Sequence, residues 1–372
     1  MMKKSMLVGI IVTLLIVTAA ACTRTAPVAP AVTVAAPAVT VTAPAPPAPP
    51  IVIRFHHVQT QAAASLWEEF WAAEVEERTG GKVEIEMTWA SPVVKAPEYF
   101  EAVRDGVFDM GPLISAYAPA KAPTFSIMEL PSTTGNSWAA AKTWEELAKH
   151  PSVLYDLDRW NAVYLFPFMV LENQLMTVKP VNTFEDLDGL KMRCAGLWCQ
   201  ALENFGAVPI AIPAGEVYES MKSGIVEGGH SVISGFRADG IHEVAKYFVV
   251  IDFGNWGAPV VINEDTWNEL PADVQKVMRD VSSEYIDVQT DAFAGQRDEW
   301  VGEFQDAGVT FIHFSDEDKQ KVKEMSQPVW EKWVTNMDNK GYPGQEIFDA
   351  YWNALRKFEQ ERPAPAAKYP VE

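Results

Sequence analysis

One stretch near the middle of the chain, Asp186–Gly228, alternates short strand patterns with short helix patterns and constrains the fold more than any other segment. Its first strand shows apolar and cationic side chains in alternation up to Arg193, and glycines stand where the helices would end. Regular alternation of this kind is typical of an α/β protein. The patterns predict, in chain order, a strand at 189–193, a helix ending before Gly206, a strand at 208–212 and a helix at about 216–223.

The N-terminus has the pattern of an export signal that ends at a cysteine. Lys3 and Lys4 precede the apolar run Met6–Ala21, and the small residues before Cys22 suit cleavage and acylation of that cysteine. An uncleaved transmembrane anchor is the alternative, although the run is short for a bilayer. We therefore expect residues 1–21 to be a signal peptide and Cys22 to carry a lipid anchor. The protein would then lie outside the cytoplasm, in the periplasm or on the outer face of the cytoplasmic membrane.

The composition changes twice along the chain. From the cysteine onward, residues 22–50 are almost wholly Ala, Pro, Val and Thr, which cannot bury a core and favour extended polyproline conformation, so we expect a stiff spacer. A strand pattern then begins at Ile51, and a helical stripe and the alternating strand Val83–Trp89 follow it, as in a βαβ unit. At the other end, residues 363–372 are rich in Pro and Ala and are expected to fray.

Length and charge narrow the class of protein. A chain of 372 residues is long enough for two domains of ordinary size. Its 50 acidic against 30 basic side chains give a net charge of −20, which argues against nucleic acid and anionic lipid surfaces as partners. A small anion would therefore need a local cationic pocket.

Three motifs in the chain point to the same kind of protein. The central one reads D-L-D-G-L-K-M-R, then a helix, then G-A-V-P-I and P-A-G-E-V-Y-E-S-M-K-S-G-I-V-E-G. Residues 98–109 fit the pattern E-x-x-x-x-V-R-x-G-x-x-D, and residues 265–271 fit part of the pattern N-K-x-x-W-x-x-L-P. Together these motifs resemble the DctP-type solute-binding subunit of TRAP (tripartite ATP-independent periplasmic) transporters. The resemblance implies an α/β, two-lobe periplasmic-binding-protein-like (Venus flytrap) fold with mixed sheets, interlobe crossover strands and long C-terminal helices.

The resemblance also implies a division of the chain between two lobes. Lobe I would take residues 51–170 with 259–298, and lobe II residues 171–258 with 299–362. The substrate would lie between the lobes, which close on it, and the membrane permease subunits of the transporter would recognise the closed shape.

Arg193 is the main candidate for ligand binding. In the resembling family the arginine of this strand pairs with the substrate carboxylate, whereas from the pattern alone it could be a strand arginine in a surface ion pair. Asn173 is neutral where some relatives have a second arginine. We therefore expect a monocarboxylate, such as a 2-oxo or hydroxy acid, and keep a dicarboxylate as the alternative.

Other polar and aromatic residues fall where the family places ligand contacts or in loops after predicted strands. Each has a structural alternative, because a single histidine or tryptophan is more often a core or loop residue than a ligand contact. These further candidates are His57, Gln59, Tyr117, Trp198, His230, Ser231 and Trp256.

No cofactor is expected. Some relatives that bind 2-oxo or hydroxy acids hold a metal beside the carboxylate, and Glu227, Asp239 or Glu264 could supply oxygen ligands for calcium or sodium. None of the three lies in a dedicated calcium-loop pattern, and His56, His57 and His230 lack the spacing of a zinc site.

Two cysteines remain after the one that would be acylated, Cys194 and Cys199. A disulfide is allowed outside the cell but needs a favourable geometry between a strand end and a helix start, so we expect free buried thiols.

Catalysis is not expected, because the sequence contains no nucleophile elbow, phosphate loop or zinc helix. The remaining alternative to transport is a binding protein that reports its ligand to a signalling partner.

Overall fold

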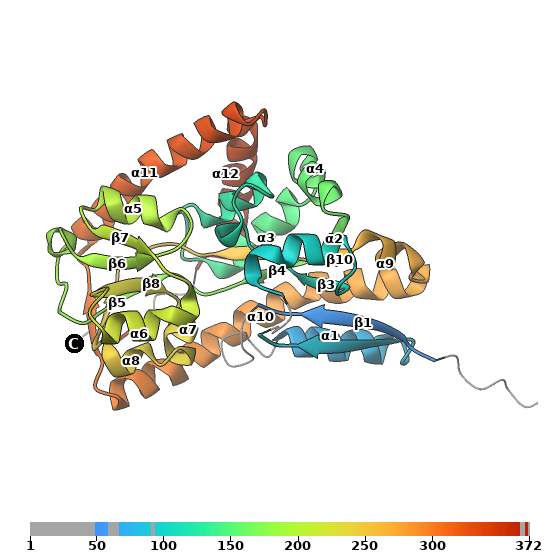
Figure 1. Ribbon diagram of the computed structural model, residues 1–372, viewed down its shortest axis with the longest axis horizontal. Helices are drawn as coiled ribbons and strands as arrows, with labels where there is room; N and C mark the ends of the chain where they lie inside the picture. Colours follow the sequence, from blue (N-terminus) through green and yellow to red (C-terminus); the bar gives the residue numbers. More distant parts are fainter. Residues whose placement is uncertain (1–48, 59–66, 91–93, 365–368, 371–372) are drawn as a thin grey trace, which may run out of the picture. The chain divides into compact units, whose positions relative to one another are not determined.

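The computed structural model describes residues 49–58, 67–90, 94–364 and 369–370. The predicted acylation site Cys22, nearly all of the predicted spacer, and Gln59 lie outside the described residues. The described part contains two mixed β-sheets with helices packed around them (Figure 1). This is the mixed α/β fold that the sequence predicts.

The first sheet has five strands in the described part of the chain, in the order β2-β1-β3-β10-β4. β1 pairs in parallel with β2 and β3, and β10 is antiparallel to both β3 and β4. The carboxyl ends of the first four strands and the start of β10 therefore lie at the same edge. The strands are β1 (Ile51–His56), β2 (Val83–Thr88), β3 (Met110–Pro112), β4 (Ala162–Met169) and β10 (Gly257–Asn263).

The second sheet, over the same described residues, has the order β11-β9-β5-β8-β6-β7. β6 is parallel to β7 and β8, and β5 is antiparallel to β8 and β9. The start of β5 therefore shares an edge with the carboxyl ends of its neighbours. The strands are β5 (Gln174–Thr177), β6 (Lys191–Cys194), β7 (Val208–Ala211), β8 (Gly228–Ser231), β9 (Tyr247–Val250) and β11 (Thr310–His313).

Two crossover segments join these edges, as predicted from the family. Residues 170–173 lead from β4 to β5, and residues 251–256 lead from β9 back to β10. They are hydrogen-bonded to each other, because the Asn173 amide donates to the Gly254 carbonyl at 2.8 Å and the Phe253 amide donates to the Asn173 carbonyl at 3.1 Å. Loops at the carboxyl ends of both sheets thus meet at the crossovers, where ligands of α/β proteins commonly bind.

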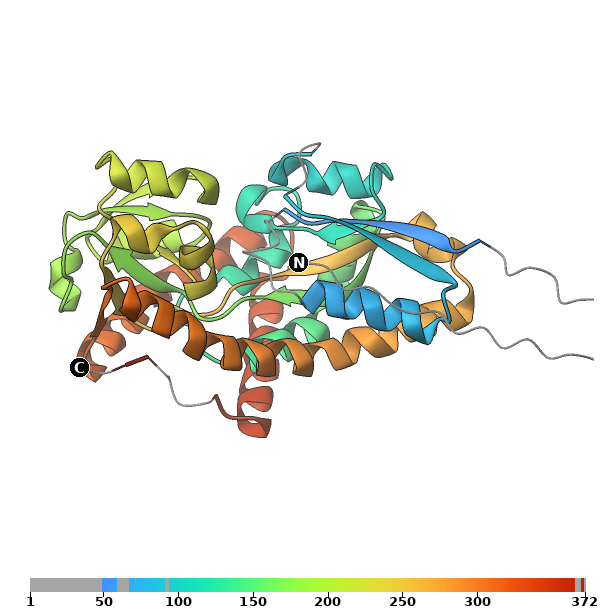
Figure 2. The same cartoon turned by 90° about the horizontal axis from the view of Figure 1, so that it is seen from below.

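The longest helix, α10 (Ala272–Asp306), contacts β4 of the first sheet, the helices α1 and α3, and α7, which follows β8 of the second sheet (Figures 1 and 2). The Trp71 ring of α1 packs 5.0 Å from the Phe166 ring, which lies 4.6 Å from the Tyr285 ring of α10. All three are fully buried, so this aromatic contact fixes α10 on the first sheet.

The other helices are short, apart from two at the C-terminal end of the chain. α12 packs against α3 and α11, and α11 also contacts α5. The α-helices are α1 (Trp67–Arg78), α2 (Tyr99–Arg104), α3 (Ser137–Leu147), α4 (Pro151–Arg159), α5 (Trp198–Asn204), α6 (Val217–Lys222), α7 (Ile233–Ala238), α8 (Ile241–Val244), α9 (Glu264–Glu269), α11 (Asp316–Asn339) and α12 (Gly344–Glu361). The 3-10 helices are η1 (Ala96–Glu98), η2 (Ser115–Tyr117), η3 (Pro123–Glu129), η4 (Phe184–Leu187) and η5 (Ala214–Glu216).

The C-terminal end departs from the sequence prediction. Residues 363–372 were expected to fray, but Tyr369 is 4% exposed and its ring lies 5.1 Å from that of Phe248 in β9. His313 Nε2 also lies 2.9 Å from the carbonyl oxygen of Pro370. The prediction was wrong for these residues, because an aromatic ring near a chain end can still pack into a distant apolar surface.

The sequence patterns also missed β11, which lies between the long C-terminal helices α10 and α11.

The division of the chain into lobe I and lobe II, with the boundaries given above, stays a prediction. Within the described residues, no helix is both long enough and apolar enough to span a bilayer.

Candidate functional site

Arg193 lies in β6 near its carboxyl end and is 6% exposed. Its Nε donates to the Ile212 carbonyl at 2.8 Å, and its Nη1 donates to the His230 carbonyl at 3.1 Å. Within the described residues it forms no salt bridge, and Nη2 makes no hydrogen bond. Burial lowers the pKa of Arg193, but a guanidinium stays charged in proteins. Two main-chain carbonyls therefore orient this cation and leave one side of its fork available to an anion.

His230 and Asn173 form a buried support beneath Arg193. Because the Ala195 amide donates to His230 Nε2 at 3.2 Å, the proton of the neutral ring lies on Nδ1, which donates to Asn173 Oδ1 at 3.1 Å. Asn173 Nδ2 in turn donates to the Gly254 carbonyl at 3.3 Å. Burial, and secondly the charge of Arg193, lower the pKa of His230 well below its usual range, so the ring is neutral. The structure thus brings the predicted site residues Arg193, Asn173 and His230 together. The side chains of Asn173 and His230 are hydrogen-bonded within the protein.

Trp198 packs on the same support. Its ring stacks on His230 with 5.2 Å between the centroids, and its Nε1 donates to the Phe253 carbonyl at 3.3 Å. Ser231, the last residue of β8, is partly exposed beside these groups. A direct contact between a ligand and any of these residues stays a prediction.

Two acidic or phenolic groups lie within the electrostatic reach of Arg193. Burial raises the pKa of Tyr117, at the end of η2, and the charge of Arg193 opposes that shift. Asp239, at the end of α7, behaves in the same way. Tyr117 lies in η2, which follows β3 of the first sheet, and Arg193 lies in β6 of the second, so groups that come from both halves of the fold interact electrostatically at this guanidinium.

A group of aromatic side chains lies at the carboxyl-end edge of the first sheet. The buried His57 ring lies 5.1 Å from Trp89 and 4.9 Å from Phe168, and Phe168 lies 5.6 Å from Trp256. Trp89 and Trp256 are partly exposed. Trp89 was not among the sequence candidates, although its place directly after a strand could have marked it.

Glu129 is a second residue that the sequence did not reveal. Its side chain is 1% exposed and accepts a hydrogen bond from Ser115 Oγ. Burial raises the pKa of Glu129 to about 7, in spite of hydrogen bonds from Ser115 and the Ala116 amide. One of its carboxylate oxygens lies beside Gly196, so close that a Cβ added to this glycine would be 2.6 Å from the oxygen. Glu129 therefore lies where η3 contacts the loop after Arg193.

The cysteine prediction was wrong. Cys194 and Cys199 form a disulfide with their Cα atoms 5.1 Å apart, because α5 begins with a turn that brings its first residues back over the end of β6. The bridge lies directly beside Arg193.

The metal candidates have separate surroundings. Glu227 is paired with Lys179 at 2.8 Å, Asp239 faces Arg193, and Glu264 lines a surface pocket at α9. In the residues that the structure describes, no three Asp, Glu, His or Cys side chains gather as a metal-binding group. We therefore derive no step through a metal.

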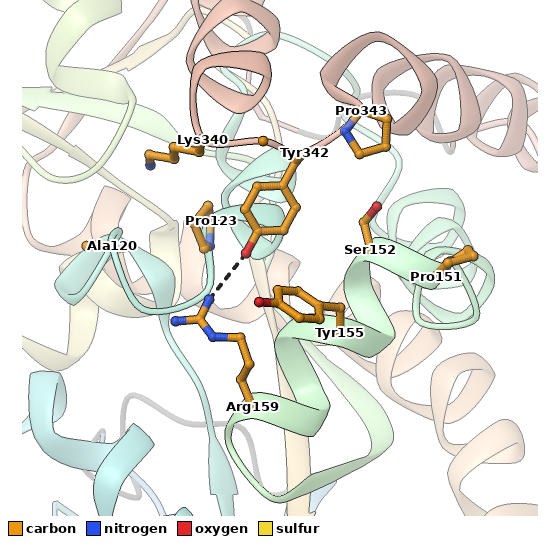
Figure 3. Close-up of a pocket in the computed structure, with 10 residues that line it drawn as sticks. Ala120, Pro123, Pro151, Ser152, Tyr155, Arg159, Lys340, Tyr342 and Pro343 are labelled. Atoms are coloured by element: carbon orange, nitrogen blue, oxygen red, sulfur yellow. Dashed lines mark hydrogen bonds between the residues drawn. The ribbon is translucent and has the colours of Figure 1, made fainter.

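Surface pockets also occur away from Arg193. One of about 770 Å³ is formed by α4 and the turn between α11 and α12 (Figure 3). There Arg159 Nη1 donates to the Tyr342 hydroxyl at 3.3 Å, and that hydroxyl donates to Asp156 at 2.6 Å. Another of about 470 Å³ lies beside β4. None of the predicted ligand-binding residues that the structure describes lines either pocket, so the chemistry at Arg193 identifies the candidate site.

Known proteins match most of the chain. The family model of bacterial extracellular solute-binding protein, family 7, matches residues 56–336. The C4-dicarboxylate-binding periplasmic protein DctP of Rhodobacter capsulatus is 27% identical over 294 residues, covering 76% of this chain and 86% of that protein. The monocarboxylate 2-oxoacid-binding periplasmic protein of Nostoc sp. is 22% identical over 299 residues, covering 77% of this chain and 78% of that one.

The fold has a counterpart among solved structures. A TRAP periplasmic solute-binding protein from Desulfovibrio salexigens aligns with a TM-score of 0.73 and 25% identity, covering 83% of this chain and 97% of that one. Since the family model spans well over half of the sequence and the fold agrees, this protein belongs to bacterial extracellular solute-binding protein family 7, as a solute-binding protein of the TRAP type and not an enzyme.

Proposed function

We propose that this protein captures a small organic carboxylate outside the cytoplasm and delivers it to the membrane subunits of a TRAP-type secondary transporter. The observation that carries the proposal is the buried guanidinium of Arg193, which two main-chain carbonyls hold and which forms no salt bridge with a carboxylate of the described residues, although the charge of Asp239 acts on it. A buried cation without an ion-pair partner is costly, and a ligand carboxylate would supply that partner.

The charges near Arg193 favour a monocarboxylate, such as a 2-oxo or hydroxy acid. The ionisable groups that act on Arg193 are Tyr117 and Asp239, neither of them a cation, and His230 is neutral. A second carboxylate would meet the negative charge of Asp239 without a second cation to offset it. A hydroxyl group could instead donate a hydrogen bond to that carboxylate.

The two curated relatives differ in what they bind. The name of the Rhodobacter protein gives C4-dicarboxylates, and that of the Nostoc protein gives monocarboxylate 2-oxoacids. Both are carboxylates, which is compatible with an arginine clamp. A dicarboxylate stays the alternative ligand, and reporting to a signalling partner stays the alternative to transport. Genes for two multi-span membrane subunits beside this one would favour transport, and a gene for a sensor kinase would favour signalling.

A thermal-shift screen tests the ligand class. The panel contains lactate, pyruvate, succinate, glucose and choline, each at a saturating concentration. A ligand at one hundred times its dissociation constant stabilises the folded state by about 2.7 kcal/mol, which is a clear shift in melting temperature. We expect lactate or pyruvate to give the largest shift. Stabilisation by glucose or choline and by none of the acids would reject the proposal.

Substitution of Arg193 tests the clamp directly. Arg193→Ala leaves the bound anion unpaired, so we expect affinity for the best acid to fall by roughly two to three orders of magnitude, equivalent to about 3–5 kcal/mol. Arg193→Lys should keep part of the affinity and lose discrimination among acids, because an ammonium cannot present two parallel donors. Isothermal titration calorimetry measures both variants.

Arg159→Ala, which removes an arginine from the pocket of Figure 3, is the matched control and should bind like the wild type. Circular dichroism on the same samples verifies folding. Unchanged affinity in a well-folded Arg193→Ala protein would contradict the assignment.

A further inference from the structure

The disulfide between Cys194 and Cys199 closes the loop that directly follows Arg193. Cys194 is buried at the end of β6, and Cys199 is partly exposed in α5. Among the main-chain hydrogen bonds of the intervening residues 195–198, the Gly196 carbonyl accepts from the Cys199 amide at 3.4 Å and the Leu197 carbonyl from the Gln200 amide at 3.1 Å. Gly196 has a φ of 56°, in the left-handed region. The bridge adds a covalent link between the two ends of this loop.

Towards the second sheet, residues 195–198 contact the side chain of His230, which lies beside the Arg193 guanidinium. The Ala195 amide donates to His230 Nε2 at 3.2 Å, and the Trp198 ring stacks on the same imidazole at 5.2 Å. The His230 carbonyl is one of the two acceptors that orient Arg193. Displacement of the loop would thus remove the hydrogen bond and the ring stacking that fix the His230 side chain beside Arg193, while the His230 carbonyl stays in β8.

On the side of the first sheet, the loop makes a close contact at Gly196. A Cβ placed on Gly196 would lie 2.6 Å from Glu129 Oε2 and 3.4 Å from the Ala116 Cβ. Only glycine allows this approach without a shift of the neighbouring groups. Residues 195–198 therefore lie between the His230 side chain of β8 and the 3-10 helices η2 and η3.

We propose that the Cys194–Cys199 disulfide is a positioning element of the ligand site: by holding residues 195–198 against the His230 ring and Glu129, it keeps the groups around Arg193 in the arrangement that receives a carboxylate. The inference rests on the proposed function of Arg193. Opening the bridge returns conformational freedom to the loop, and a ligand must then supply the free energy of ordering it again. The sheets hold their own hydrogen bonds and remain folded.

The experiment compares the oxidised full chain with the double variant Cys194→Ser/Cys199→Ser. The probes are lactate and pyruvate, measured by calorimetry, and amide hydrogen exchange is followed in peptides that contain residues 195–198. We expect roughly tenfold weaker binding, which corresponds to about 1.4 kcal/mol of lost preorganisation. Exchange in the loop should become faster, whereas exchange in β8 and β9 should not change.

Reduction of the wild type gives a second route to the same state. A dithiol reductant breaks the S–S bond, each sulfur gains one electron and one proton, and the dithiol is oxidised to its own disulfide. The reduced wild type should match the double variant, and the reductant should not affect the variant. This comparison remains decisive if the double variant folds poorly.

Ile347→Val, a small truncation in the buried core of α12, is the control for general destabilisation. It should lower the melting temperature without weakening probe binding. Unchanged loop exchange after reduction, or unchanged affinity in the reduced protein, would overturn the inference. If neither acid binds the oxidised wild type, the proposed function fails for these acids, while loop exchange still decides whether the bridge orders residues 195–198.

Discussion

Glu129 illustrates how burial changes the pKa of a single side chain. Its carboxyl group accepts hydrogen bonds from the Ser115 hydroxyl and the Ala116 amide, and burial nevertheless raises its pKa from 4.5 to about 7. Tyr117, whose own pKa Glu129 raises, is the ionisable group that faces it. Below pH 4.5 the group is protonated in both folded and unfolded states. As the pH rises towards 7, the unfolded chain ionises first, so the folded state loses stability, by about 3 kcal/mol in total.

Glu129→Gln should remove this part of the pH dependence. Chemical unfolding measures the free energy of unfolding at pH 5 and at pH 8. Between these two pH values it should fall by more in the wild type than in Glu129→Gln. Glu331→Gln, an exposed glutamate on α11, is the matched control and should keep the wild-type difference. Equal pH dependence of the wild type and Glu129→Gln would show that Glu129 ionises normally.

At the scale of elements, Tyr369 ties the end of the chain to β9, β11 and α10. Its ring packs 5.1 Å from Phe248 and 6.2 Å from Phe311. It also lies 5.6 Å from the guanidinium carbon of Arg297, which forms a buried ion pair with Glu172 at 3.1 Å. Because Glu172 belongs to the crossover at 170–173, Tyr369 covers an ion pair that links α10 to the crossover.

Tyr369→Ala should therefore destabilise the protein by about 3 kcal/mol, the usual effect of truncating a buried aromatic ring. Urea unfolding followed by circular dichroism measures the difference. Tyr369→Phe retains the ring and should cost much less. If Tyr369→Ala were as stable as the wild type, the end of the chain would not pack this way in solution.

At the scale of the whole molecule, we propose that Cys22 carries a lipid and that residues 22–50 separate the binding unit from the membrane. Cys22→Ser should release the protein from the membrane fraction or leave its precursor unprocessed, because the acylated thiol is lost. Fractionation and labelling with a radioactive fatty acid measure both effects. Two results together would contradict the lipid anchor: the wild-type protein takes up no lipid label, and Cys22→Ser is processed as efficiently as the wild type.

The sequence by itself determined the local elements of this protein. The predicted strands and helices of the central stretch agree to within about two residues with β6, α5, β7 and α6, because side-chain periodicity and glycine positions act over only a few residues. The motifs around Arg193 likewise identified the family, since they are contiguous in the chain.

Only the tertiary structure decided which groups became partners. The proton position on His230 depends on the Ala195 amide, 35 residues away in the chain, and β11 exists because it pairs with β9, which lies far earlier in the chain. The burial of Glu129, the packing of Tyr369 and the approach of Cys199 to Cys194 likewise depend on how elements pack. Hydrogen bonding, burial and charge are settled by neighbours in space, and those neighbours are brought together only when the two sheets, the crossovers and the long helices assemble.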